Sequence, residues 1–477
     1  TVRAATSSML PPRFSLGLVV VLVSIFQVCA GYNSAGSLRW EHHRRFFDDD
    51  RFYNPPNGWE NAKPGEILSR RKVDVAPVGL FKLGVTAYQL LYRTTGLHDG
   101  DATTSVTTVL IPDNHDRDKL ISASVYEDSI SPLCAPSRRF KLGNNVVKNL
   151  AISYQSLFIT SLLHEGWIVT VPDHEGPESA FTAGPLEGHI ILDAVRATLS
   201  FDRANLHSDA KVIGYGYSGG ALANGWAASL QDSYASELNV VGWSLGGTIT
   251  NLFTWLRYID GTSGAGFAFG SVMGISAVDN DFKWIRRGLT SRGQAAYDVA
   301  RHACMYENLV PLLYQETISD NFFRGGSSFF VDSNVREAFG KYHLGGDNVP
   351  TPKAPVFMFH AIADAVVPYG DAYQTAQTWC RNGAKVKFVT NVGAEMGHTS
   401  TEITNLPSVL WFMRDRFRGK NWYNECQFTQ TLDPWFNIVN AATSLGKFWQ
   451  QMLDLLGGRI GKADSLLLSK LKKHQIP

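Results

Sequence analysis

The fold of this chain is decided by residues 211–220, which read KVIGYGYSGG. The first seven residues predict a buried strand, and the helix formers that follow Gly220, up to Leu230, predict a helix. Ser218 therefore lies in a tight strand-to-helix turn, which holds its hydroxyl above the sheet where substrate can reach it. The flanking glycines let the backbone bend sharply. The start of the helix, with the N–H of Gly219, is suited to bind an oxyanion.

A second stretch, residues 242–246 (GWSLG), has the same spacing of glycines around Ser244. The pattern alone therefore does not choose the nucleophile, but its context does, because the turn requires a strand before the serine and a helix after it. Ser218 has both, whereas weak helix formers follow Ser244 in residues 246–250. We predict that Ser218 is the nucleophile and that Ser244 lies at a strand end.

Short runs rich in β-branched and aromatic residues alternate with helical patterns from residue 65 onward. Such alternation implies a mostly parallel sheet with helices on both faces, and together with the serine turn it predicts an α/β-hydrolase fold. A crossover helix is expected at 187–199, where apolar residues recur at helical spacing. Strands are expected at 85–92, 105–111, 121–126, 167–171, 212–217, 240–243, 356–359 and 386–389.

The chain is expected to have six segments. Residues 1–30 read as a signal peptide, with Arg13 before an apolar run and small residues after it; an uncleaved anchor is the alternative. Residues 1–8 precede Met9 and are interpreted as an artefact of cloning or of the gene model. The other segments are a flexible arm at 31–50, a hydrolase core at 51–242, an aromatic-rich cap or lid at 243–348, a second core part at 349–426 and a C-terminal extension at 427–477.

The acid and the base are sought after the serine, because this fold places them on loops that follow later strands in the order serine, acid, histidine. His398 lies in a glycine-bounded loop after a strand, whereas His474, the other histidine that far along, belongs to a basic tail. Asp364 follows the preceding strand, and the surroundings of its rival, Asp371, are typical of a helix start. We predict that Asp364 orients His398, which removes the proton of Ser218.

Composition excludes some classes of partner. The 44 basic and 43 acidic side chains leave a net charge of +1, so no long-range field attracts nucleic acid. No cysteine spacing resembles a zinc site. Cys29 lies in the leader, and outside the cell the remaining four cysteines predict two disulfides with three possible connectivities. These four are Cys134, Cys304, Cys380 and Cys426.

Several separated blocks of sequence carry a family resemblance. They are RFYNPP at 51–56, YEDS at 126–129, PDHEGP at 172–177, Gly184 with EGH at 187–189, GYGYSGG at 214–220, and Asp364 with VPY at 367–369. With these blocks, the chain from about Asp50 to Cys426 resembles the fungal secretory lipase family of the lipase A type. The resemblance implies hydrolysis of acylglycerols and fatty esters, and a helical lid between the nucleophile strand and the acid strand.

The resemblance also implies roles for particular residues. Asp128 would complete the oxyanion hole with Gly219, and the segment that holds Ser244 matches a stretch of the family without a catalytic serine. The implied disulfides join Cys134 to Cys304 and Cys380 to Cys426.

Two acidic motifs have a second interpretation. An ionised Asp128 would repel an oxyanion, so it helps only if its carboxyl is protonated or if its backbone N–H donates; a turn-forming aspartate is the alternative. Residues 173–175, Asp-His-Glu, could suggest a metal site, but a Gly-Pro turn that carries charges is favoured.

The expected function is that of a secreted serine lipase that acts as a monomer on lipid esters at an oil–water interface, without metal or organic cofactor. The apolar cap suits long acyl chains. The same triad also serves carboxylesterases, acyltransferases and prolyl-type peptidases, which the fold does not separate. A non-catalytic secreted binding protein is the alternative from another class. The C-terminal extension, with its basic end at 470–474, is expected to cover the site, anchor at lipid or pack on the core.

Overall fold

A computed structural model describes residues 50–76, 82–98, 100–142, 150–393, 397–420 and 425–432. The predicted signal peptide, almost all of the predicted arm, and the extension beyond residue 432 lie outside the described residues. Within the described part of the chain, no helix is both long and apolar enough to cross a membrane.

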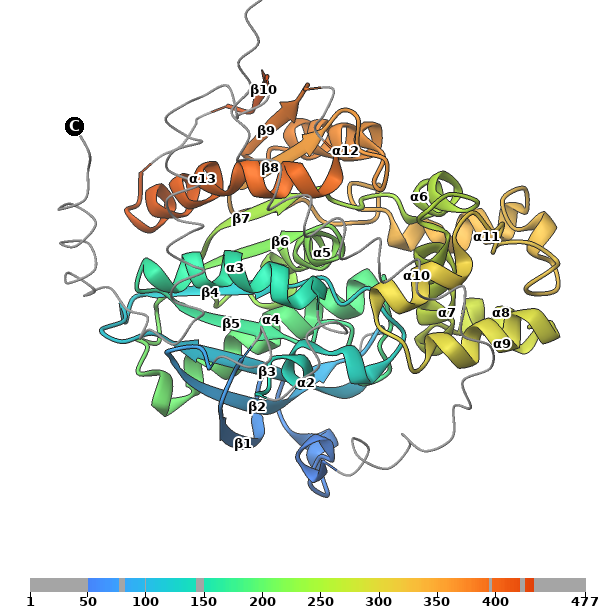
Figure 1. Cartoon of the computed structure of the whole chain (residues 1–477). Helices are drawn as coiled ribbons and strands as arrows, with labels where there is room; N and C mark the ends of the chain where they lie inside the picture. The colour runs from blue at the N-terminus through green and yellow to red at the C-terminus, as the bar shows by residue number, and fades with distance from the viewer. Residues whose placement is uncertain are drawn as a thin grey trace, which may run out of the picture. The chain divides into compact units, whose positions relative to one another are not determined.

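Ten strands form one sheet in the order β1-β2-β3-β5-β4-β6-β7-β8-β9-β10 (Figure 1). The first four in this order pair antiparallel, and all pairs from β5 onward are parallel. The predicted α/β class with a mostly parallel sheet is confirmed. The strands are β1 (Ile67–Val73), β2 (Thr86–Thr95), β3 (Ala102–Ile111), β4 (Lys119–Ser124), β5 (Ile168–Pro172), β6 (Lys211–Tyr217), β7 (Val240–Gly246), β8 (Val356–Ala361), β9 (Val386–Asn391) and β10 (Gln427–Thr431).

Helices cover both faces of the sheet, and each face has its own apolar core. On one face, α4, α5 and α12 contribute to one buried cluster, while α3 and α13 contribute to the cluster on the other face. The helices are α2 (Pro136–Arg139), α3 (Leu150–His164), α4 (Gly184–Ser200), α5 (Gly219–Tyr234), α6 (Leu252–Ile259), α7 (Ala265–Val278), α8 (Lys283–Arg287), α9 (Ser291–Ala300), α10 (Met305–Leu312), α11 (Ser333–Ala338), α12 (Tyr369–Arg381) and α13 (His398–Phe417).

The register of the parallel strands brings the segments of interest to one edge. Ser124 at the end of β4 pairs with Gly216 near the end of β6, and Gly246 at the end of β7 pairs with Phe359 near the end of β8. Loops that follow these strands therefore meet at the carboxyl edge of the sheet, where open α/β sheets place their sites.

The chain between β7 and β8 is helical rather than part of the sheet. It contains α6 to α11, which gather to one side of the sheet (Figure 1). β7 continues to Gly246, so the first residues of the segment predicted as a cap from 243 are strand, and its first helix begins at Leu252.

Candidate active site

Ser218 lies at the sharp turn between β6 and α5 with φ 53° and ψ −122°. A non-glycine residue rarely adopts a positive φ, and such backbone strain is typical of functional sites. The turn requires its glycines, because a Cβ on Gly216 would lie 2.1 Å from the carbonyl oxygen of Gly220, and one on Gly220 would lie 2.2 Å from that of Ser124. The predicted strand, turn and helix around Ser218 are therefore all present.

The structure brings Ser218, His398 and Asp364 into one chain of hydrogen bonds. His398 Nε2 lies 2.8 Å from Ser218 Oγ, and His398 Nδ1 lies 2.7 Å from Asp364 Oδ2. The Asp364 side chain is fully buried, whereas that of His398 is 14% exposed. With Nδ1 carrying the proton toward Asp364, Nε2 is free to accept the proton of the serine hydroxyl.

The carboxylate of Asp364 is held in its ionised form. Its Oδ1 accepts the backbone N–H groups of Val366 and Val367, both at 2.8 Å, and His360 Nε2 lies 3.4 Å from Oδ2. Burial alone would raise the pKa of Asp364, but the nearby imidazoles of His398 and His360 together hold that pKa well below its usual range. His360 was not predicted as part of this site.

Neighbouring side chains fix the loops that carry the acid and the base. From α6, Tyr258 donates its hydroxyl to the carbonyl of Asp364 at 2.8 Å, and Trp255 Nε1 donates to the carbonyl of Val366 at 3.0 Å. Tyr217, the residue before Ser218, donates its hydroxyl to the carbonyl of His398 at 2.5 Å. The first helix of the inserted segment therefore braces the acid loop.

Asp128 lies in the loop after β4, beside the start of α5. Its φ is 46°, and its Oδ1 lies so close to Gly219 that a Cβ on the glycine would come within 2.2 Å of it. Burial raises the pKa of the Asp128 carboxyl to about 7, which places it in its neutral form in mildly acidic solution. Asp128 and Gly219, the two residues predicted for the oxyanion hole, thus lie next to each other beside Ser218.

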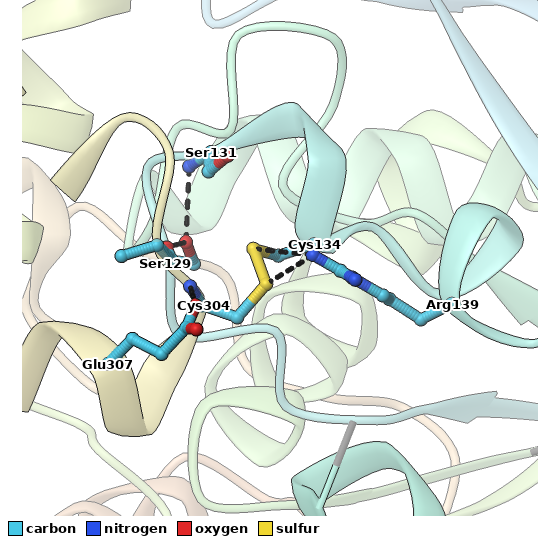
Figure 2. Close-up of a disulfide and its surroundings, with 7 residues drawn as sticks. Ser129, Ser131, Cys134, Arg139, Cys304 and Glu307 are labelled. Atoms are coloured by element: carbon cyan, nitrogen blue, oxygen red, sulfur yellow. Dashed lines mark hydrogen bonds between the residues drawn. A yellow bond between two sulfur atoms is a disulfide. The ribbon is translucent and has the colours of Figure 1, made fainter. Parts of the chain in front are cut away.

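A disulfide ties the loop of Asp128 to the inserted helices (Figure 2). Cys134 is bonded to Cys304, the residue before α10, and Ser129 donates its hydroxyl to the carbonyl of Ala303 at 2.9 Å. Arg139 lies against the disulfide, with its Nη2 2.8 Å from Cys304 Sγ. The second disulfide joins Cys380 on α12 to Cys426 before β10. Both pairs match those that the family resemblance implies.

Beneath Asp128 lies a group of buried acidic residues that sequence reasoning missed. Burial, and to a lesser extent repulsion from neighbouring carboxylates, raises the pKa of the Glu127 and Glu175 carboxyls well above the usual range. Burial likewise raises the pKa of Glu187. Burial lowers the pKa of His174 to about 3. The turn favoured for this stretch is present at residues 174–179, and the side chains of Asp173, His174 and Glu175 are buried. Among the described residues, no cluster of histidine, cysteine and acidic side chains could hold a metal ion.

The alternative candidates for nucleophile and acid, Ser244 and Asp371, have other surroundings in the structure. Ser244 is fully buried inside β7, opposite Tyr215 of β6. Asp371 lies in the first turn of α12 and accepts a hydrogen bond from Thr254. His474 lies outside the described residues.

The chain matches known proteins over most of its length. A model of the family described as "Secretory lipase" matches residues 142–425. The chain is 58% identical to a secreted triacylglycerol lipase of Malassezia globosa, over 97% of this chain and 98% of the relative. It is 53% identical to a secreted triacylglycerol lipase of Malassezia furfur, over 90% and 92% of the two chains.

Solved structures show the same architecture. The X-ray structure of Candida antarctica lipase A superposes with a TM-score of 0.76 at 30% identity and covers 84% of this chain and 94% of that one. An esterase from Xanthomonas oryzae, LipA, shares the fold at 15% identity, with a TM-score of 0.55 and 76% of this chain covered. On the family match and the identity along nearly the whole chain, the protein belongs to the secretory lipase family.

Proposed function

We propose that this secreted lipase hydrolyses triacylglycerols through an acyl-enzyme on Ser218, with His398 as base and Asp364 as the acid that orients it. Two observations support the proposal: the relatives named above are secreted triacylglycerol lipases, and the three side chains form a continuous chain of hydrogen bonds of 2.8 and 2.7 Å. The second observation carries the assignment of residues, because nucleophile, base and orienting acid must be in hydrogen-bond reach of one another.

In the first step, Ser218 Oγ attacks the ester carbonyl while His398 Nε2 takes its proton. The oxyanion is stabilised by the N–H of Gly219 and by Asp128, whose neutral carboxyl or backbone N–H donates. Collapse of the tetrahedral intermediate expels the alcohol, which receives the proton from His398. Water then attacks the acyl-enzyme by the same sequence and releases the fatty acid, and the histidine returns to its starting form.

We propose further that α10 and the residues after it contact the oil–water interface. Tyr306 and Val310 lie one turn apart on α10, and Leu313 and Tyr314 directly follow the helix; each of the four side chains is more than a third exposed. An exposed apolar face of this kind is typical of a contact with lipid or another protein. Because α10 is bonded through Cys304 to the loop of Asp128, this face is covalently joined to the predicted oxyanion hole.

The test of the assignment is Ser218→Ala, measured against Ser244→Ala as a control. With tributyrin and with a soluble nitrophenyl ester, we expect Ser218→Ala to lose hydrolysis by about 10⁴-fold or more and to resist labelling by a fluorophosphonate. The Ser244→Ala enzyme should be labelled as the parent is. An active Ser218→Ala enzyme would contradict the proposal, and hydrolysis of a short soluble ester without hydrolysis of emulsified long-chain triacylglycerol would indicate a carboxylesterase.

A further inference from the structure

A buried glutamate lies on the helix of His398 and has no part in the proposed triad. Glu402 comes one turn after His398 on α13, so the two side chains share one side of the helix. Glu402 is only 1% exposed. Burying a carboxyl this deeply destabilises the folded protein unless neighbouring groups form hydrogen bonds with it.

Glu402 is hydrogen-bonded to residues of α3 and β6. Gln155 on α3 donates its Nε2 to Glu402 Oε1 at 3.1 Å, and the hydroxyl of Tyr215 on β6 lies 3.4 Å from the same oxygen. The other end of the Gln155 amide, Oε1, accepts the backbone N–H of Tyr126 at 2.7 Å. Tyr126 lies in the loop after β4, two residues before Asp128. Gln155 thus bridges the loop of Asp128 and the helix of His398.

The surroundings of Glu402 favour its neutral form. Burial raises its pKa to about 8, although the hydrogen bonds from Gln155 and Tyr215 and the nearby hydroxyl of Tyr154 partly offset that rise. Tyr154 and Tyr215 are themselves buried, and burial together with the Glu402 carboxyl raises their pKa values. A neutral acid and a glutamine have nearly the same shape, and both offer an acceptor oxygen to Gln155. The amide should therefore replace the acid here.

We propose that Glu402 and Gln155 are positioning residues, which hold the helix of His398 and the loop of Asp128 in register for catalysis. This inference rests on the proposed triad and oxyanion hole. The base His398 and the predicted oxyanion residue Asp128 are carried by segments more than 250 residues apart in the sequence, and they must act on the same carbonyl within a few tenths of an ångström. The Gln155 bridge joins those two segments directly, through atoms that are shielded from water.

The test compares four variants by kcat and KM on a soluble nitrophenyl ester, per fluorophosphonate-labelled site. For Glu402→Leu and Gln155→Leu, we expect kcat to fall by about 10-fold to 100-fold, with KM within about twofold of the parent. Glu402→Gln should retain kcat within about twofold. The double variant Gln155→Leu/Glu402→Leu should fall no further than the worse single variant, because both changes break one bridge.

A matched control separates positioning from a mere tie between two helices. Arg414 on α13 donates its Nε and Nη2 to the carboxylate of Glu165, just after α3, and this pair lies at the partly exposed far end of the same helix. Glu165→Gln should lower the unfolding temperature slightly and leave kcat unchanged.

The outcomes are distinct. Leucine variants that fold with an unchanged kcat, or single effects that add fully in the double variant, would overturn the inference. A Glu402→Gln enzyme as poor as Glu402→Leu would also overturn it, because the amide preserves the bridge. If instead Ser218→Ala is active, the proposed function itself has failed, and that result is independent of the ones above.

Discussion

At the scale of single residues, the side chain of Asp128 leaves no room for a side chain at position 219. A Cβ there would lie 2.2 Å from Asp128 Oδ1, so Gly219→Ala must push the Asp128 side chain away. We expect kcat to fall by about 10²-fold, the usual cost of losing one oxyanion donor, while fluorophosphonate still reacts slowly with Ser218. Gly340→Ala is the control, because nothing lies within 4 Å of the added carbon. Equal activity of both variants would contradict the assigned oxyanion hole.

The raised pKa of Asp128 predicts that kcat depends on pH. Its raised pKa of about 7 means that the neutral carboxyl predominates below that pH and the carboxylate above it. A negative charge next to the developing oxyanion is unfavourable, so kcat should fall as the pH rises through about 7. Asp128→Asn is neutral at every pH and should remove that fall. An Asn variant with the parent's alkaline limb would exclude Asp128 as its source, and full activity in Asp128→Ala would assign the donor to the backbone N–H.

The three residues that the sequence predicted for the triad, and that the structure brings together, are recognisable from their local context. Ser218 was found from its strand, its glycines and its helix, and Asp364 and His398 from their order after later strands. Glu402 and Gln155 could not be found in that way. A glutamate or glutamine in a helical pattern is most often at the surface, and only the packing of α3 and α13 on the same face of the sheet makes these two buried neighbours.

At the scale of elements, the two disulfides predict different consequences. Each closes a long loop, with 170 residues between Cys134 and Cys304 and 46 between Cys380 and Cys426, so the chain-entropy model gives each about 4 to 5 kcal/mol of stability. Only the first is attached to the loop of Asp128. We expect Cys134→Ala/Cys304→Ala to lower both the unfolding temperature and kcat.

The double alanine variant of Cys380 and Cys426 is the matched control, because that disulfide joins α12 to the edge strand β10. It should lower the unfolding temperature comparably and leave kcat near that of the parent. Equal losses of kcat in the two double variants would show that the Cys134–Cys304 disulfide has no particular connection with catalysis.

Two strands, β1 and β10, were not predicted from the sequence, and the same physical reason explains both omissions. β1 reads ILSRRKV and β10 reads QFTQT, and both are edge strands with exposed positions. Edge strands carry polar and charged side chains, so they lack the apolar pattern by which the central strands were predicted. The eight predicted strands are all present, and all of them lie inside the sheet, where burial on both faces imposes that pattern.

At the scale of the whole molecule, the helices inserted between β7 and β8 are attached to the site in two ways. α6 is hydrogen-bonded through Trp255 and Tyr258 to the acid loop, and α10 is bonded through Cys304 to the oxyanion loop. The strands that precede these two loops, β4 and β8, lie on opposite sides of β6, which leads to Ser218. The inserted helices are therefore attached to the core on both sides of the nucleophile. A change at the outer surface of α10 has a short covalent route to Asp128.

The exposed apolar residues on and just after α10 predict a difference between emulsified and soluble substrates. Val310 on α10 and Leu313 directly after it are exposed, and replacing both with serine would remove apolar area from the proposed lipid contact. We expect hydrolysis of emulsified triacylglycerol to fall about 10-fold while kcat on a soluble ester stays within about twofold, because burial of two such side chains contributes about 1.4 kcal/mol or more. Trp411→Ser removes an exposed aromatic side chain from α13 instead and should spare both activities. Parallel losses on both substrates would place the effect of α10 in the catalytic step and not at the lipid surface.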